Sequence, residues 1–268
     1  MNHKIGFIGS GNMGSAMMGG IIGSGLCTPA QMIASDPAQA ALDRLSETYQ
    51  IHTTTDNLAV VTFSDIIFLA VKPYMYESVI EEIRDLVDET KIIVAIAAGV
   101  SHKKLDTYFR KPVKTVRVMP NTPAMVLEAM SALTPNEQVT EAELADIVTI
   151  FESFGKAEVV PESMMDTVVG VSGSSPAYVY MFIEAMADAA VADGMPRPQA
   201  YKFAAQSVLG AAKMVLETGK HPGELKDMVC SPGGTTIAAV AKLEEEGFRN
   251  AVISAQRVCV EKSKDMGK

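Results

Sequence analysis

The chain has 268 residues, of which 48% are hydrophobic and 21% are charged, so its composition is that of a globular protein and excludes disordered, collagen-like and coiled-coil classes. Its net charge is −9, and the sequence has no long basic run, which argues against nucleic acid or an anionic membrane as a partner. No apolar run reaches the roughly 18 residues of a transmembrane helix, so we expect none.

Short runs rich in β-branched residues alternate with helical patterns over the first 160 residues. The run Ile66–Val71 is apolar throughout, as expected for a strand that is buried on both faces of a parallel sheet. Thr140, followed by Glu143, marks the start of a helix. This alternation predicts a doubly wound parallel α/β sheet. Its strands are predicted at Lys4–Ile8, Met32–Ser35, Ile66–Val71, Ile92–Ile96, Val113–Val118 and Ala157–Val160.

From Pro161 onward the pattern changes to long helical stretches rich in alanine and methionine. We therefore place a boundary near residue 160, with an α/β domain over residues 1–160 and an all-α domain over residues 161–268. Apolar residues on more than one face of these helices favour an obligate dimer with interlocked helices, because one small domain cannot bury them. Helices are predicted at Ala177–Asp193, Gln199–Glu217, Pro222–Val229, Thr235–Glu246 and Phe248–Lys264.

The strongest local motif is a glycine-rich turn after the first predicted strand. Gly9 permits the tight turn, Gly11 lets the backbone approach a pyrophosphate, and Gly14 lets the next helix pack closely on the strand. The start of that helix offers N–H groups and the positive end of its dipole to phosphates. Asp36 follows Gly14 by 22 residues, at the end of the second strand, where a carboxylate would meet the adenosine ribose. The arrangement favours NADH or NADPH binding over a plain glycine turn.

Three further loops follow predicted strands at the edge where open α/β sheets bind ligands. The first contains Lys72, for which a surface position is the alternative. The second has Ala97 and Ala98, whose small side chains permit close approach of a flat ring. The third carries the amide of Asn121 in a segment stiffened by two prolines. These loops supply the candidate cofactor residues Ala70, Val71, Lys72, Pro73, Ala97, Ala98 and Asn121.

Two loops rich in glycine and serine precede helices in the second half of the chain, at residues 170–176 and 231–236. Exposed N–H groups and hydroxyls at a helix start form an anion site of carboxylate size. Each loop is also compatible with an ordinary helix cap. Two such loops in one helical domain favour ligand binding.

The cysteines and the N-terminus indicate a reduced compartment. Cys27, Cys230 and Cys259 show no CxxC or CxxH spacing, which argues against a disulfide framework and against a zinc site. The first residues lack the long apolar segment of a signal peptide. We therefore expect a cytoplasmic protein without a metal site and without a membrane partner.

Six motifs, spread over nearly the whole chain, resemble the pyrroline-5-carboxylate reductase family, which catalyses the last step of proline synthesis. They are Phe7–Met13, Ala70–Pro73, Val118–Pro123, Val171–Tyr178, His221–Asp227 and, most specific of all, Ser231–Thr236. The resemblance implies a Rossmann domain that binds NAD(P)H, followed by a helical dimerisation domain, with the dimers often joined in a ring. It also implies that the substrate binds between the cofactor and the Ser231–Thr236 loop of the partner subunit.

The resemblance also assigns roles to individual residues. It places the cofactor against residues 70–73 and 97–98 of the loops above and against Ser10, Gly11, Asn12, Met13 and Asn57, beside the Gly9 that the glycine spacing already assigns to the cofactor turn. It places the substrate carboxylate and ring nitrogen against Thr235 and Thr236, in a loop with Ser231, Gly233 and Gly234, and it places Glu162 nearby. Met228 stands where some relatives have a cofactor-contacting asparagine, so that contact is not inherited. The segment Ser35–Pro37 varies among relatives, so the resemblance does not imply a choice between NADH and NADPH either.

The function expected is reduction of the C=N bond of 1-pyrroline-5-carboxylate to L-proline, with a hydride from the nicotinamide. The substrate loop has no histidine or lysine to give the proton, so we expect Thr236 to orient the substrate by a hydrogen bond. A β-hydroxyacid dehydrogenase or another imine reductase is the alternative enzyme. The helix after Pro176 has no lysine in its first turns to act as the base of a hydroxyacid enzyme. A non-catalytic dinucleotide sensor would have no reason to keep the Ser231–Thr236 loop.

Overall fold

The computed structural model of the chain describes residues 3–267, which fall into two compact units. The first unit, here called the sheet unit, runs to Ser174 and includes the chain again from Cys259 onward. The second, the helical unit, comprises Ser175–Val258. Residues 1–2 and 268, the outermost positions of the predicted domains, lie outside the described residues.

The division between the units lies later in the chain than the predicted boundary near residue 160. Packing explains the difference. Met165 is buried against Met119 and Ala132 of the sheet, so the segment after residue 160 stays with the strands. The last part of the C-terminal helix returns to the same unit, where the Ser263 hydroxyl donates a 2.6 Å hydrogen bond to Asp166.

Eight strands form one sheet in the order β3-β2-β1-β4-β5-β6-β7-β8. The first six of these follow the doubly wound order that was predicted, but β6 and β7 are antiparallel, so the sheet is mostly rather than wholly parallel. Two of the strands, β3 and β7, were not predicted. The bounds are β1 Ile5–Ile8, β2 Met32–Ser35, β3 His52–Thr54, β4 Ile66–Leu69, β5 Ile92–Ala95, β6 Lys114–Met119, β7 Ala129–Pro135 and β8 Gly155–Val159.

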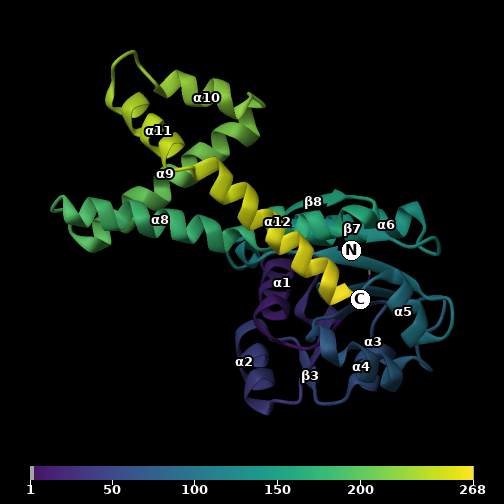
Figure 1. Ribbon diagram of the computed structural model, residues 1–268. Helices are drawn as coiled ribbons and strands as arrows, with labels where there is room; N and C mark the ends of the chain where they lie inside the picture. The colour runs from purple at the N-terminus through teal and green to yellow at the C-terminus, as the bar shows by residue number, and fades with distance from the viewer. Residues whose placement is uncertain (1–2, 268) are drawn as a thin grey trace. The chain divides into compact units, whose positions relative to one another are not determined.

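Helices cover both faces of the sheet (Figure 1). On one face Phe7, Phe68 and Phe151 belong to a cluster to which α1, α2 and α6 contribute, and the first two rings stack with centroids 4.5 Å apart. On the other face Ile67 and Leu69 pack with residues of α3, α4 and α5. Strand β4 thus sends alternate residues into two apolar layers, which confirms the prediction of a strand buried on both faces. The helices are α1 Asn12–Gly23, α2 Gln39–Tyr49, α3 Asn57–Phe63, α4 Tyr76–Ile83, α5 His102–Phe109 and α6 Glu141–Glu152.

Short helical turns connect these elements, and several of them follow the carboxyl ends of strands. They are η1 Pro29–Gln31, η2 Pro73–Met75, η3 Thr122–Val126, η4 Glu162–Met164, α7 Met165–Val168 and η5 Val169–Gly173. The last is a π-helical turn, so residues 170–173 wind into a helix where a glycine-serine loop was predicted. Thr140 and Glu143 form the predicted capping box of α6.

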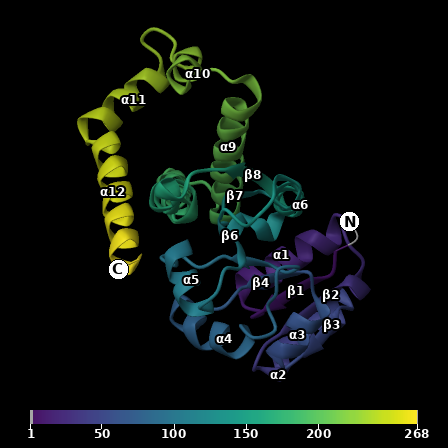
Figure 2. The same ribbon diagram turned by 90° about the vertical axis from the view of Figure 1, so that its right-hand side faces the viewer.

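The helical unit contains α8 to α11 and most of α12, and Figure 2 shows α10 and α11 at one end of the long α9. Among its described residues only Ala187, Ala200 and Ala204 are buried. Large apolar side chains are exposed instead, with Met181 at 71% and Leu216 at 80%. The unit therefore lacks a hydrophobic core of its own. The five predicted helices are confirmed, with bounds α8 Ser175–Ala192, α9 Arg197–Thr218, α10 Pro222–Val229, α11 Thr235–Glu245 and α12 Phe248–Gly267.

Within residues 3–267 the structure contains no helix that is both long and apolar enough to span a lipid bilayer.

Candidate active site

The turn between β1 and α1 requires glycine at two positions. Gly9 has φ +99°, and a Cβ there would lie 2.7 Å from the carbonyl oxygen of Ala70. A Cβ on Gly14 would lie 2.8 Å from the carbonyl oxygen of Gly9, so α1 packs against the turn as closely as it can. A Cβ on Gly11 would meet no atom within 4 Å. The turn is closed on its inner side and open at Gly11.

This turn fits the pyrophosphate of a dinucleotide. Helix α1 begins after Gly11, and among the described residues no side chain caps its first turn. The N–H groups of that turn and the positive end of the helix dipole are therefore available to an anion. Asn12 is exposed and Met13 is half-buried, and both belong to the turn that the anion would contact. The arrangement is the one that the glycine spacing predicts.

Asp36, at the end of β2, is held against the glycine-rich turn. Its Oδ2 accepts hydrogen bonds from the N–H of Ser10 at 2.9 Å and from the Ser10 hydroxyl at 2.7 Å, and its Oδ1 accepts one from the N–H of Ala38. Partial burial raises the pKa of Asp36, but the bonds from Ala38 and Ser10 outweigh it and lower the pKa below its usual value. The side chain is thus a fixed negative charge beside the turn.

Asn57 begins α3 and links it to two other elements. Its Oδ1 accepts a 2.7 Å hydrogen bond from the hydroxyl of Ser35, the residue before Asp36, and its Nδ2 donates a 2.8 Å bond to Glu82 of α4. Asn57 therefore lies next to the end of β2, and its predicted contact with the cofactor stays a prediction. Its side-chain amide thus links α3 to the end of β2 and to α4.

The loops after β4 and β5 lie side by side, because these strands are parallel neighbours. Residues Ala70, Val71 and Pro73 are half-buried, and Lys72 is exposed. Ala97 and Ala98 follow β5 and are also half-buried. The hydroxyl of Tyr76, a residue that sequence reasoning missed, bonds to the backbone of both loops. Its signal was weak, since an aromatic residue at a helix start indicates only packing.

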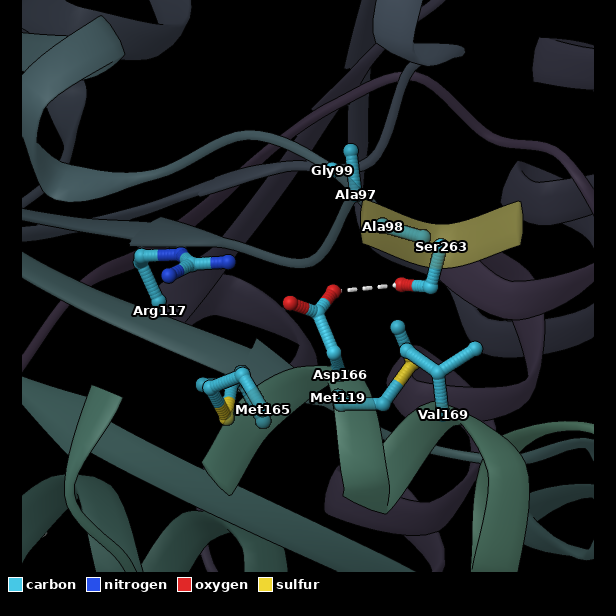
Figure 3. A pocket seen from close by; sticks show the side chains of 10 residues that line it. Ala97, Ala98, Gly99, Arg117, Met119, Met165, Asp166, Val169 and Ser263 are labelled. Atoms are coloured by element: carbon cyan, nitrogen blue, oxygen red, sulfur yellow. Dashed lines mark hydrogen bonds between the residues drawn. The ribbon is translucent and has the colours of Figure 1, made fainter. Parts of the chain in front are cut away.

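A small cavity lies at the carboxyl ends of β5 and β6, and Figure 3 shows the side chains around it. Asp166 points into it and accepts the hydrogen bond from Ser263 across it. Gly99 has φ +76°, and a Cβ there would lie 3.2 Å from the main chain of Met266, so the end of α12 packs directly on this loop. None of these contacts was predicted, since they join residues far apart in the sequence. The cavity is lined by Ala97, Ala98, Gly99, Arg117, Val118, Met119, Met165, Asp166, Val169 and Ser263.

Glu162, predicted to lie near the substrate, is the anion of a polar cluster beside this cavity. Its Oε1 accepts hydrogen bonds from the Arg117 guanidinium and, at 2.9 Å, from the N–H of His102. Burial raises the pKa of Glu162, but the His102 N–H and the Arg117 charge prevail, so the pKa is lowered. The His102 ring contacts the Thr115 hydroxyl and the carbonyl oxygen of Thr134, and burial lowers its pKa. His102 is therefore a structural neutral imidazole at pH 7.

Asn121, predicted to touch the cofactor, is buried and forms two hydrogen bonds to backbone. Its Nδ2 donates a 3.0 Å hydrogen bond to the carbonyl oxygen of Ser172, and its Oδ1 accepts one from the N–H of Met130. The side chain holds the π-helical turn against the sheet. A direct contact with the cofactor stays a prediction.

The loop of residues 231–236 belongs to the helical unit and forms the N-terminal end of α11. Gly233 has φ +67°, a conformation that favours glycine, and a Cβ on Gly234 would displace the Ser231 hydroxyl, whose Oγ would lie 2.3 Å away. Thr235 and Thr236 lie in the first turn of α11, and among the described residues no side chain caps that turn. Thr235 is exposed and Thr236 half-buried. Two hydroxyls and N–H groups thus stand at one helix end, the arrangement that binds a carboxylate.

Comparison with known protein families matches both halves of the chain. The model described as pyrroline-5-carboxylate reductase dimerisation matches residues 162–266. The model described as NADP oxidoreductase, coenzyme F420-dependent, matches residues 4–99. The second match covers the glycine-rich turn, Asp36 and the loops after β4 and β5. The first covers Glu162, Asp166 and the Ser231–Thr236 loop.

Curated proteins resemble the chain over its full length. A pyrroline-5-carboxylate reductase from Escherichia coli is 54% identical over 268 residues, which is 100% of both chains. One from Methanosarcina acetivorans is 48% identical, over 100% of this chain and 99% of the relative. Among solved structures, a pyrroline-5-carboxylate reductase from Coxiella burnetii has a TM-score of 0.93 at 32% identity and covers 100% of each chain. A pyrroline carboxylate reductase from Plasmodium falciparum, solved with NADP bound, has a TM-score of 0.91 at 32% identity over 100% of this chain and 99% of that one.

Proposed function

The chain belongs to the pyrroline-5-carboxylate reductase family, and we propose on that premise that it reduces the C=N bond of 1-pyrroline-5-carboxylate to give L-proline, with NAD(P)H as reductant. The observation that carries this function is the match to curated reductases over 100% of the chain at 54% identity. It replaces the alternatives of a hydroxyacid dehydrogenase and of a non-catalytic sensor. The chain is an oxidoreductase with a dinucleotide-binding sheet.

The residues at the carboxyl edge of the sheet would hold NAD(P)H, which supplies the hydride that reaches C5 of the pyrroline ring. The first turn of α1 would bind the pyrophosphate, and Asp36 would lie beside the adenosine ribose. The loops with Ala70 and Ala97 would lie along the nicotinamide half. Because these loops sit on parallel strands of a buried sheet, they hold their positions with little loss of entropy on binding.

Substrate recognition is assigned to the Ser231–Thr236 loop. The N–H groups at the start of α11 and the hydroxyl of Thr235 suit a carboxylate, because a helix N-terminus stabilises negative charge. The Thr236 hydroxyl would orient the ring nitrogen. A threonine hydroxyl is too weak an acid to give up its proton at neutral pH, so the proton on nitrogen comes with the substrate or from solvent.

The active enzyme is proposed to be a homodimer, in which each Ser231–Thr236 loop serves the cofactor of the partner subunit. The match to a dimerisation family over residues 162–266 supports the dimer, and so does the scarcity of buried residues in the helical unit. Association of dimers into a ring is proposed on the family resemblance alone. A cytoplasmic location is supported by the three unpaired cysteines.

The decisive experiment measures the loss of NADH or NADPH absorbance at a saturating concentration of 1-pyrroline-5-carboxylate. Chromatography then identifies the product. We expect oxidation of the cofactor that depends on the substrate, with one L-proline formed for each cofactor oxidised. The same assay with a β-hydroxyacid tests the alternative activity. Cofactor oxidation that is independent of pyrroline-5-carboxylate, over a range of pH and salt, would overturn the proposal.

A further inference from the structure

The hydroxyl of Tyr76 uses its whole hydrogen-bonding capacity on two loops of the active site. Tyr76 is the first residue of α4, and its side chain is fully buried. The hydroxyl donates to the carbonyl oxygen of Leu69 at 2.6 Å and accepts from the N–H groups of Ile96 and Ala97, each at 3.1 Å. One donor and two acceptor positions are all that a phenol has.

The three backbone partners lie where two strands end. Leu69 is the last residue of β4, and Ile96 and Ala97 are the first two residues after β5. The strand order changes direction between β1 and β4, so the adenosine half of a bound dinucleotide would lie over β1 and β2 and the nicotinamide half over β4 and β5. Within residues 3–267 the hydrogen bonds of the hydroxyl therefore go to the ends of β4 and β5 on the nicotinamide side, and none goes to β1 or β2.

We propose that Tyr76 is a positioning residue for the nicotinamide half of the cofactor. The inference rests on the proposed function for the identity of the cofactor and extends it to a residue outside the binding surface. The ring packs among apolar side chains of α3, α4 and α5, so its oxygen has a fixed position against the sheet. That oxygen sets the spacing of the loops that carry Ala70 and Ala97.

Replacement of Tyr76 by phenylalanine isolates this role, since the ring remains and only the oxygen is lost. The carbonyl of Leu69, which is buried, and two partly buried N–H groups then lose their partner. The loops must shift or admit water to recover these bonds. A displacement of about 1 Å at a reacting group costs on the order of 100-fold in rate, so hydride transfer is sensitive to this change.

The test compares two ligands that differ only in the half that Tyr76 is proposed to position. Binding of NADH and of ADP-ribose to full-length Tyr76→Phe is measured by calorimetry, together with kcat and KM for 1-pyrroline-5-carboxylate. We expect the Kd for NADH to rise about 10-fold and kcat to fall about 10- to 100-fold. The Kd for ADP-ribose should change less than about twofold, because the turn at Gly9 and Asp36 is untouched.

Tyr108→Phe is the matched control, because Tyr108 packs against the same apolar cluster from α5 and no hydrogen bond joins it to either loop within residues 3–267. It should leave both dissociation constants and kcat unchanged. Equal weakening of NADH and ADP-ribose in Tyr76→Phe would indicate a general structural role and overturn the proposal. Unchanged kcat and NADH binding would overturn it as well.

A second measurement keeps the proposal testable if Tyr76→Phe does not fold. Hydrogen exchange of the Ile96 and Ala97 amides in the wild-type enzyme should slow about 10-fold more with NADH than with ADP-ribose, because both ligands leave the bonds intact but only NADH contacts the loops. The same degree of slowing with both ligands would count against the proposal. Turnover of 1-pyrroline-5-carboxylate by the wild type tests the proposed function separately, since the binding and exchange comparisons need no turnover.

Discussion

Thr236 is half-buried and lies in the first turn of α11, at a helix end that no side chain caps among the described residues. We expect Thr236→Ala to lower kcat/KM for 1-pyrroline-5-carboxylate by about 10- to 1000-fold and to raise KM, because one hydrogen bond to a charged or developing centre is worth roughly 1.5–4 kcal/mol. Cofactor binding should be nearly unchanged. Steady-state kinetics and NADH calorimetry measure both effects.

Thr236→Ser is the control for this prediction, because it keeps the hydroxyl and removes only the methyl group. It should retain most of the activity. If Thr236→Ala has the same kinetic constants as the wild type, the Thr236 hydroxyl does not contact the substrate. An equal loss in the alanine and serine variants would indicate that the methyl group, and not the hydroxyl, matters there.

We propose that Asp36 influences whether the turn accepts NADH or NADPH. Because the bonds from Ser10 and Ala38 hold the pKa of this carboxyl below its usual value, it is ionised at neutral pH. The extra phosphate of NADPH would place a second negative charge beside the Asp36 carboxylate, and at an exposed site this repulsion costs about 1–2 kcal/mol. We therefore expect NADH to be preferred over NADPH or to be used equally well. Measurement of kcat/KM with both cofactors tests the preference.

Asp36→Ser removes the charge and should shift the NADPH-to-NADH ratio of kcat/KM by about 5- to 30-fold toward NADPH. Asp43→Ser, on the exposed part of α2, is the control and should leave the ratio unchanged. A strong wild-type preference for NADPH that the Asp36 substitution does not alter would show that this carboxylate does not face the ribose.

At the scale of elements, Glu162 joins the short helix η4 to β6 through Arg117 and to the start of α5 through His102. Its folded-state pKa is lowered, so the ionised form contributes stability that is fully present above the unfolded pKa of about 4.5 and is lost as the pH falls through the folded pKa. The side chain is 41% exposed, so solvent screening reduces the contribution to about 1 kcal/mol.

We therefore expect Glu162→Gln to lower the free energy of unfolding by about 1 kcal/mol at pH 7, and we expect the difference from wild type to shrink below about pH 4.5. Urea unfolding at pH 7, 5, 4 and 3 measures it. Glu158→Gln, on the exposed face of β8, removes the same charge without an ion pair among the described residues. A difference between Glu162→Gln and wild type that is constant across this pH range would contradict the ion-pair explanation.

At the scale of the whole molecule, the two units differ in how they are stabilised. The sheet unit buries two large apolar clusters, one on each face of the sheet. The helical unit buries three alanines and exposes most of its large apolar side chains. Exposed apolar surface of this extent is typical of a surface that a partner covers. We expect the partner to be a second copy of this chain.

Sedimentation at micromolar concentration should show a dimer or a larger assembly. Met181→Asp places a charge on the exposed apolar face of α8 and should favour the monomer and abolish turnover, while binding of ADP-ribose by the sheet unit persists. Leu86→Asp, an exposed apolar position of the sheet unit, should leave the sedimentation unchanged. A wild-type monomer that is stable and active would refute the dimer.

The strands and helices with strong local patterns were predictable from the sequence. The all-apolar run that became β4, the capping box at Thr140 and the glycine spacing at Gly9 each carry their structural reason within a few residues. Strands β3 and β7 were not predicted, since β3 has only three residues and β7 has a single β-branched residue, Thr134, and ends in Pro135. Their formation depends on a neighbouring strand, and a neighbour is not visible in a local pattern.

The sequence by itself determined the glycine-rich turn, the five C-terminal helices and which residues form the loops after β4 and β5, because backbone geometry and periodicity are local properties. Only the tertiary structure decided what Asp36, Asn57 and Asn121 bond to, since their partners are Ser10, Glu82 and the backbone at Ser172. The hydrogen bonds of Tyr76 and the hydrogen bond between Asp166 and Ser263 were likewise visible only in the tertiary structure. Hydrogen bonds between distant residues form only when packing brings them within about 3 Å, and that proximity is a property of the folded chain and not of any segment of its sequence.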